Sequence, residues 1–372
     1  MGIIERDTKK RTLLIKKKRI TIFARLVKVG GIMATQVKER DYYFDNARFI
    51  LIFLVVFGHF ISPIKSQSDW LYTIYNFIYT FHMPAFILIS GFFTKGVRKD
   101  GYLSKIFRKI LIPYIVFQLI YSFFYYDLYN KSEMKLNFFD PHWALWFLLS
   151  LVFWNVLLKV FVKMKYPLLL AIGIGIAVGY ITEIGTYLSL LRTFVFFPVF
   201  LLGHYLTKRD FKQILKPSIR IASGVFLVLM FLAYHFFIPD QAKDWLLSSS
   251  SYADILGHNE WYGGVIRLGL YAVMFLSTFS FLAIIPKRRF FFTEFGERTL
   301  YIYLLHGFVL KYLFTTDLFS KIEDNNYYVM LLVLAVIITM FLASKPVIAL
   351  AQPLIELRWS KLNRMLKKEE KS

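Results

Sequence analysis

Long apolar runs alternate with short polar segments along most of the chain. The runs cover residues 46–64, 72–94, 108–128, 144–163, 166–182, 193–207, 219–238, 263–285, 299–314 and 327–350. Most can cross a hydrocarbon core of ~30 Å at ~1.5 Å per residue, although 193–207 and 299–314 are short for a span. None shows the side-to-side alternation of a membrane β-barrel strand. The pattern predicts an all-α, polytopic membrane protein with about ten transmembrane helices.

The polar segments between the runs differ in charge. Lys and Arg gather in every second segment, namely before residue 46, at 95–109, 159–165, 208–220 and 286–298, and after residue 345. Cytoplasmic loops carry such an excess of positive charge. Both the N-terminus and the C-terminus are therefore predicted to be cytoplasmic, in a multi-pass protein of the cell membrane.

Composition agrees with a membrane location. Of the 372 residues, 57% are hydrophobic and 19% are aromatic, which is more apolar surface than one soluble core can bury. The net charge of +22 follows the loops, so it indicates topology and contact with anionic membrane lipid, and we expect no nucleic-acid partner. Cysteine is absent and no His pair has zinc-site spacing, so no metal site is expected.

Three parts of the chain are distinguished by this pattern. Residues 1–40 form a basic cytoplasmic extension without a long apolar run, so they are not a cleavable signal peptide. Met33 is a possible alternative start, and we expect the extension to be dispensable. Residues 41–352 form the transmembrane domain, and residues 353–372 form a basic cytoplasmic tail.

Ionisable side chains inside the apolar runs are the first candidates for chemistry, because each costs at least ~2.5 kcal/mol near the centre of a span. Arg48 lies near the start of the first run and His59 near its far end. Eleven steps of ~100° return to within ~20° of the starting direction, which places both side chains on one helix face, ~16 Å apart. A cation and a titratable imidazole on one stripe mark a polar path through the membrane. The alternative is that both residues only anchor the helix at the two interfaces.

Two further histidines fall within apolar runs. His82 precedes Pro84 in the second run, and His306 lies in the middle of the ninth. Imidazole is the usual proton carrier near neutral pH, so His306 and His82 are candidates for acid–base chemistry. Either one alone is also compatible with a packing role.

The basic segment after the second run allows two interpretations. Its cations include Lys105, Arg108 and Lys109. They are sufficient to set topology, and they are equally suited to bind phosphate groups.

These residues resemble the motifs of the membrane acyltransferase-3 family. Arg48 and His59, ten residues apart and preceded by Asp45, resemble the signature of its first helix. The stretch FHMPAFILISGFF resembles its Ser-Gly-Phe/Tyr element, with Ser90 in the serine position. FRKILIPY resembles the basic pair that precedes a proline, and it contains Arg108 and Lys109.

Two more stretches are similar to the subgroup of this family that is related to fucose 4-O-acetylase. They are LWFL (residues 145–148) and FGERTLYIYLLH, which ends at His306. The resemblance extends over residues 41–350. One departure is Lys105, which stands where many relatives carry a second arginine.

The resemblance implies a reaction and a set of site residues. The family moves an acyl group, usually acetyl, from cytoplasmic acyl-CoA to a hydroxyl of a surface carbohydrate. By this resemblance His59 is the general base or is itself acylated, Arg48 orients the donor or pairs with Asp45, and His306 is a second base or orients the hydroxyl. The expected contacts with acetyl-CoA are made by Arg108, Lys109, Lys105 and Ser90.

The residues alone leave two other functions open. A transporter for a lipid-linked sugar or a small solute would also need a polar path through the membrane. A membrane scaffold without chemistry would need only the helices. Consumption of a thioester would distinguish the enzyme from both.

Overall fold

The computed structural model describes residues 41–134, 136–237 and 242–356, and these contain helices but no β-strand. The basic extension at 1–40 and most of the tail at 353–372 lie outside the described residues. The chain divides into two compact units, and the unit Tyr43–Ser372 contains nearly everything described below. The predicted all-α class is confirmed for this part of the chain.

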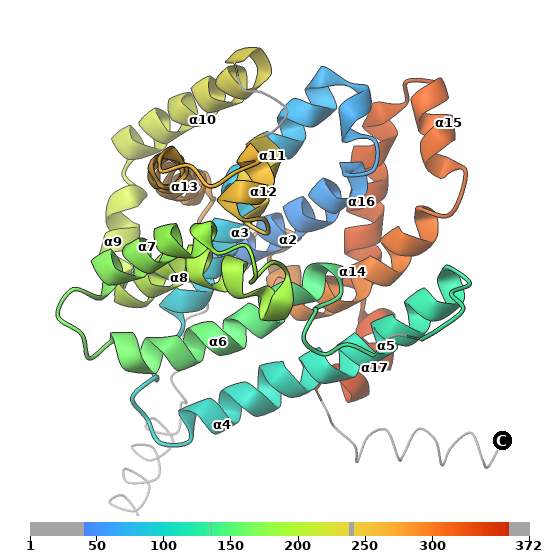
Figure 1. Cartoon of the computed structure of the whole chain (residues 1–372). Coiled ribbons are helices and arrows are strands. Elements are labelled where there is room, and N and C mark those ends of the chain that lie inside the picture. Colours follow the sequence, from blue (N-terminus) through green and yellow to red (C-terminus); the bar gives the residue numbers. More distant parts are fainter. Residues whose placement is uncertain (1–40, 135, 238–241, 357–372) are drawn as a thin grey trace, which may run out of the picture. The chain divides into compact units, whose positions relative to one another are not determined.

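Each predicted apolar run coincides with a helix or a pair of helices (Figure 1). The long helices are α2 (Tyr42–Ile61), α3 (Asp69–Phe92), α5 (Ile112–Leu128), α6 (Trp146–Phe161), α7 (Pro167–Ala177), α8 (Leu190–Tyr205), α10 (Pro217–Phe237), α13 (Tyr262–Ile284), α14 (Thr299–Leu313), α16 (Tyr328–Leu342) and α17 (Lys345–Ile355). Shorter elements join them, including α4 (Tyr102–Ile106), a π-helical turn η2 (Phe107–Leu111), a 3₁₀ turn η3 (Trp143–Leu145), α9 (Lys208–Ile214), α11 (Ala242–Leu247), α12 (Tyr252–Leu256) and α15 (Leu318–Asp324).

Not every helix is long and apolar enough to cross a membrane by itself. Six helical segments meet both conditions, and α16 with α17 adds a seventh if this pair, bent by 61°, counts as one span. The helices at Pro167–Tyr180 and Thr299–Leu313 are apolar but shorter. The structure therefore supports a membrane protein with six or seven candidate spans, while ten spans and cytoplasmic termini stay predictions.

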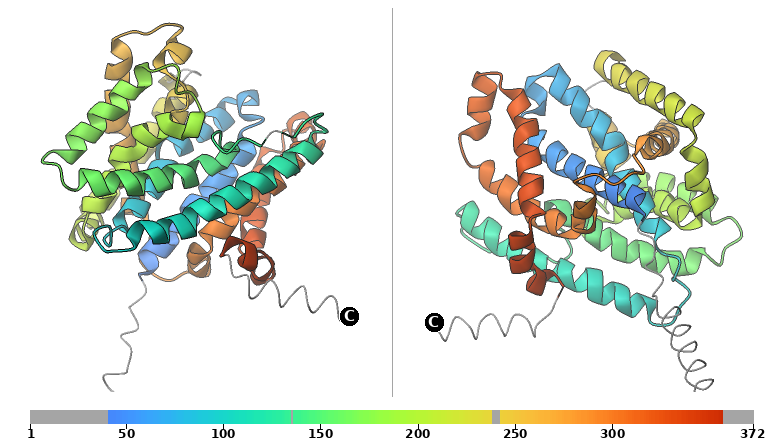
Figure 2. Two further views of the ribbon diagram at one scale, coloured as in Figure 1. Left: turned by 60° about the horizontal axis from the view of Figure 1, so that its bottom comes forward. Right: turned by 180° about the vertical axis from the view of Figure 1, so that it is seen from behind.

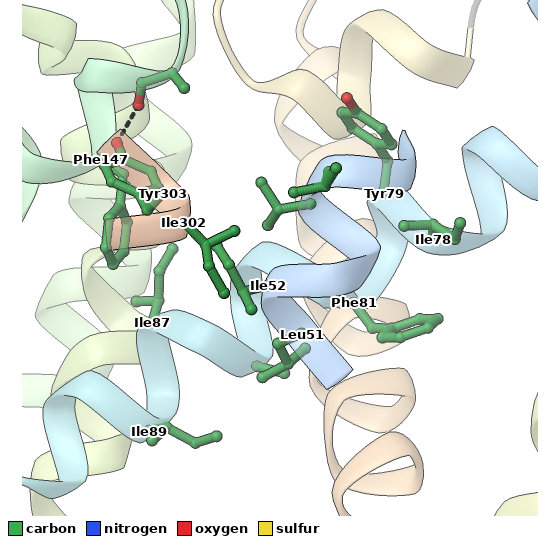
Figure 3. Close-up of a cluster of buried hydrophobic side chains, with 14 of the residues drawn as sticks. Leu51, Ile52, Ile78, Tyr79, Phe81, Ile87, Ile89, Phe147, Ile302 and Tyr303 are labelled. Carbon is green, nitrogen blue, oxygen red and sulfur yellow. Dashed lines mark hydrogen bonds between the residues drawn. The ribbon is translucent and has the colours of Figure 1, made fainter. Parts of the chain in front are cut away.

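Helix α2 lies within the core of the described unit, with α3, α13 and α14 near it (Figures 1 and 2). Its apolar side chains Leu51 and Ile52 are fully buried. Figure 3 shows Ile52 of α2 pointing toward Ile302 of α14, and both belong to the same buried apolar cluster as Ile87 and Ile89 of α3. By contrast, α10 and α16 expose large apolar side chains, as expected of helices that face lipid.

Helices α3 and α8 approach each other so closely that their backbones touch. A Cβ atom on Gly91 would lie 2.0 Å from the carbonyl oxygen of Phe200, and one on Gly203 would lie 2.1 Å from that of Leu88. Small residues allow this kind of contact between membrane helices. Gly91 of the Ser-Gly-Phe element thus has a packing role, and it holds Ser90 beside the site described next.

Candidate functional site

The structure brings together two histidines that are far apart in the sequence. His59 is in the last turn of α2 and His306 is in α14, and their ring centroids are 5.6 Å apart with the ring planes 26° from parallel. The indole of Trp143 lies against both rings, 4.3 Å from His59 and 5.3 Å from His306. Three aromatic rings from three segments therefore form the centre of this site.

Hydrogen bonding fixes the chemical state of His306. Its Nδ1 lies 2.6 Å from the carbonyl oxygen of Tyr303 and 3.2 Å from that of Ile302. A carbonyl oxygen can only accept, so Nδ1 carries a proton and donates it. In the neutral ring Nε2 then has a free lone pair, and this buried atom has no hydrogen-bond partner among the described residues. His306 thus presents an unused base or acceptor inside the core.

His59 has a different environment. It is half-buried, and its Nδ1 lies 3.3 Å from the hydroxyl of Tyr79 on α3. Tyr79 stacks on Tyr75 with ring centroids 4.0 Å apart and also contacts the edge of His82 at 4.7 Å. The Nδ1 of His82 bonds to the carbonyl oxygen of Ile78, 2.8 Å away in its own helix. Tyr79 therefore links His82 to the pair, and among the described residues the Nε2 of His59 has no hydrogen-bond partner.

Trp143 reaches the histidines because a loop holds its backbone in an unusual conformation. Its φ is +42°, in the left-handed region that costs a non-glycine residue about 1–3 kcal/mol. Gln118 of α5 stabilises this loop by donating to the carbonyl oxygens of Asn137 (2.7 Å) and Asp140 (2.9 Å) and by accepting from the His142 amide (2.9 Å). The strain is thus maintained by a network that begins in α5.

His142 adds a second tie to this loop. Its Nε2 lies 2.8 Å from the hydroxyl of Ser122 on α5. Burial, and to a lesser extent the charge of Lys131, lowers the pKa of His142, while Asp140 opposes this effect. The neutral ring is therefore favoured, and the bond to Ser122 needs no protonated imidazole.

A cavity of about 340 Å³ lies beside α2, between its Arg48 end and the histidine pair. It is lined by Arg48, Ile52, Val55, Met83, Phe86, Ile89, Ser90, Phe93, Lys109, Ile110, Phe147, Leu148, Leu151, Thr299, Leu300 and Tyr303. Polar and basic groups (Arg48, Ser90 and Lys109) thus share a cavity whose remaining walls are mostly apolar. Tyr303 lines it and also lies next to the pair, with its ring centroid 6.1 Å from that of His306.

Arg48 is partly engaged in the cavity wall. Its Nη2 donates to Asp45 at 2.5 Å, its Nε donates to the carbonyl oxygen of Phe44 at 3.3 Å, and its guanidinium lies 5.8 Å from the centre of the Phe93 ring. The side chain is 30% exposed, while that of Asp45 is only 5% exposed. Asp45 therefore orients Arg48 without covering it, so the remaining guanidinium N–H groups can bind an anion.

Comparison of the sequence with family models identifies the family of the chain that contains this site. A family model described as an acyltransferase domain, of acyltransferase-3 type, matches residues 41–344, which include every residue of the cavity and of the histidine pair. The chain belongs to the acyltransferase-3 family. It is accordingly a membrane acyltransferase.

Two curated relatives of this acyltransferase carry the same name. The chain is 24% identical over 323 residues to "Nodulation protein NolL" of Sinorhizobium fredii, covering 80% of this chain and 85% of that protein. It is 43% identical over 61 residues to "Nodulation protein NolL" of Mesorhizobium japonicum, covering 16% of each. No solved structure matches the chain.

The predicted site residues of the acyltransferase fall into three places. Arg48, Ser90 and Lys109 lie together in the cavity wall, and His59 lies with His306 beyond it. Lys105 and Arg108 are exposed on the same short helical segment as Lys109, but they are not among the lining residues. A single basic segment thus contributes one cation to the cavity and two to the surface.

Several residues near the histidines were not predicted. Tyr303 could have been found, because it is three residues before His306 and so shares its helix face. The sequence around Trp143, Arg192 and Lys311 does not mark them as site residues. Each lies at the end of an apolar run or in a loop, where tryptophan and basic residues are common. Only the tertiary structure brings them near His59.

Proposed function

We propose that this acyltransferase moves an acetyl group from acetyl-CoA to a hydroxyl of a carbohydrate at the cell surface. One observation carries the proposal. A single cavity is lined by Arg48 at the start of α2, by Lys109 of η2 and by Tyr303, whose ring is next to that of His306. A basic end, an apolar body and a base at the far end are what an acyl-CoA donor requires.

The donor would be divided between the cavity and the surface. A cavity of about 340 Å³ suits an acyl-pantetheine arm rather than the whole coenzyme. Arg48 and Lys109 would bind phosphate or carbonyl oxygens at its basic end, with Ser90 as a hydrogen-bond donor. Lys105 and Arg108, exposed on the same segment, would contact the nucleotide outside.

His59 would act as general base on the acceptor. Its free Nε2 removes the proton of a sugar hydroxyl, and the oxygen attacks the thioester carbonyl. The C–O bond forms, the C–S bond breaks, and the departing thiolate of coenzyme A takes up the proton. The Nε2 of His306, which lacks a partner among the described residues, would orient the same hydroxyl or serve as a second base.

This function requires a fixed orientation in the cell membrane, with the Arg48 end of α2 toward the cytoplasm. The natural absence of cysteine makes the orientation directly testable. Cysteines placed at Ser132 and Ser249 are expected to react from outside with an impermeant maleimide, and a cysteine at Ser218 is not. External labelling at position 218 would contradict the orientation.

The decisive experiment supplies the purified protein in lipid with radiolabelled acetyl-CoA, with and without cell-surface glycans. We expect label in the glycan and free coenzyme A in equal amounts. A solute transporter would leave the thioester intact under every condition, and that result would overturn the proposal.

A further inference from the structure

Two cations lie near His59 outside the donor cavity, and neither has an assigned role. Arg192 is in the first turn of α8 and Lys311 is in the last turn of α14. Lys311 lies against Trp143, whose ring contacts both imidazoles, and Arg192 lies against Trp146, three residues further along the chain. Neither cation lines the cavity that contains Arg48. Positive charge from α14 therefore reaches the histidine pair by way of Trp143, and a second cation lies on α8 beside Trp146, both separate from the cations of the donor cavity.

Aromatic rings hold both cations in place. The Lys311 ammonium lies 4.7 Å from the centre of the Trp143 ring, and the Arg192 guanidinium lies 5.0 Å from that of Trp146. Such contacts fix a cation without neutralising it. Trp143 is also the residue that contacts both imidazoles, so Lys311 is tied directly to the reacting centre.

Carboxylates do not neutralise these two side chains in the described part of the chain. The ion pairs within residues 41–134, 136–237 and 242–356 include neither Lys311 nor Arg192. Arg192 donates through Nε to the carbonyl oxygen of Leu247 at 3.1 Å, and Asp140 acts on it only at longer range. Half-buried cations without a paired anion are costly, unless an anion arrives from outside.

Strain supports a binding role for the wall between these cations and the histidines. Trp143 has a left-handed backbone conformation although it is not a glycine, and the hydrogen bonds of Gln118 hold the loop in this conformation. A Cβ atom on Gly307, next to His306, would lie 2.2 Å from the Tyr121 hydroxyl and 3.1 Å from the Trp143 ring, so the glycine leaves room for both side chains. Backbone strain of this kind concentrates at ligand sites.

We propose that Trp143, Lys311 and Arg192 form the acceptor subsite, and that the acceptor carries an anionic group, a carboxylate or a phosphate, beside the hydroxyl that is acylated. Lys311 and Arg192 bind the anion, and this places the hydroxyl against His59. The inference rests on the proposed function, and it adds the charge class of the acceptor.

The test compares three acceptors that share one sugar ring. They are methyl glucoside, methyl glucuronoside and methyl glucoside 6-phosphate, each supplied with radiolabelled acetyl-CoA to the full-length protein. We expect at least one anionic glycoside to have a KM about tenfold or more below that of the neutral one, because charge-assisted hydrogen bonds form only with the anion. The two anionic arms separate a carboxylate from a phosphate.

Variants connect the preference to the two cations. In Lys311→Gln and Arg192→Gln the anionic and neutral glycosides should become equal, while the KM for acetyl-CoA is unchanged. Lys311→Arg should retain the preference. Lys321→Gln, an exposed lysine on α15, is the matched control and should behave as the unmodified protein.

Two results would overturn the inference and leave the proposed function intact. One is equal or better use of the neutral glycoside, and the other is an anion preference that survives in both variants. Acetylation of cell-surface glycans with none of the three glycosides accepted would equally contradict it. Failure to consume acetyl-CoA with any acceptor would instead refute the proposed function itself.

Discussion

The two ends of α2 meet very different surroundings. At the Arg48 end, a partly exposed guanidinium pairs with Asp45 and shares an apolar cavity with Lys109 and Ser90. At the His59 end, aromatic rings enclose two imidazoles, and the nearby cations form no ion pair with a described carboxylate. A partly exposed cation that is paired with a carboxylate, such as Arg48, suits reversible binding of a donor. Buried imidazoles beside cations that lack a carboxylate partner suit proton transfer and binding of a reacting group. One helix can thus separate the two tasks by three turns.

Removing the proposed base, His59, should have the largest effect of the changes considered. His59→Ala should lower the rate of acyl transfer by about 10²–10⁴, because general-base assistance contributes roughly this much. Binding of acetyl-CoA should be preserved, since the cavity that contains Arg48 is unchanged. Transfer rates and equilibrium binding of labelled acetyl-CoA measure the two properties separately.

The exposed His258 offers the control for this change. It lies in a loop, 2.9 Å from Glu260, and His258→Ala should leave both properties unchanged. Full activity in His59→Ala would show that the base is another residue, with His306 the next candidate.

Substitution of Arg48, at the other end of α2, should affect donor binding more than the rate of transfer. Arg48→Ala should weaken acetyl-CoA binding by about 10–100-fold, because a charge-assisted hydrogen bond contributes about 1.5–3 kcal/mol. The limiting rate should fall less than in His59→Ala. Arg48→Lys should recover part of the affinity, because the charge returns without the planar fork. Steady-state KM and kcat for acetyl-CoA make the comparison, and a loss confined to kcat would contradict a donor role.

The contact between α3, which carries Ser90, and α8 can be tested by its effect on the free energy of unfolding. Gly91→Ala should destabilise the protein by about 1–3 kcal/mol, because the new Cβ meets the Phe200 carbonyl oxygen at 2.0 Å. Gly173→Ala on α7 is the matched control, since a Cβ there meets nothing within 4 Å. Thermal unfolding in one detergent should rank Gly91→Ala well below the unmodified protein and Gly173→Ala level with it or above. Equal midpoints for both variants would mean that the two helices can move apart easily.

The smallest expected effect is a difference in the KM for acetyl-CoA between variants of Lys109 and Lys105. Lys109→Gln should raise the KM for acetyl-CoA about two- to fivefold, because partly exposed ion pairs contribute about 0.2–1 kcal/mol. Lys105→Gln should change it less, because Lys105 does not line the cavity. Kinetics of the two variants at low and moderate salt provide the measurement. A larger effect at Lys105 would move the principal phosphate contact onto the protein surface.

The sequence predicted helices more reliably than it predicted spans. Each apolar run became helical, but α3 carries Thr73, Asn76, Thr80 and His82, and it is not among the candidate spans. These polar groups are buried between helices, where composition alone cannot show that they avoid lipid. Run length is therefore a good guide to helix formation and a weaker guide to membrane crossing.

The candidate site was predictable where the signal was local. Helical periodicity places Arg48 and His59 on one stripe, and the structure indeed has one at the cavity and the other at the imidazole pair. Periodicity cannot bring His306 to His59, because that contact depends on how α14 packs against α2. Trp143 depends in addition on a loop held by Gln118, so only the tertiary structure identifies it.

The backbone contact between α3 and α8 has a consequence for motion. Two helices that touch through Gly91 and Gly203, without intervening side chains, cannot slide past each other without a steric clash. The two helices are therefore expected to move together, and Ser90 on α3 moves with them. Movement that widens the cavity is therefore expected at its other wall, where the Tyr303 hydroxyl donates to the Ala144 carbonyl oxygen.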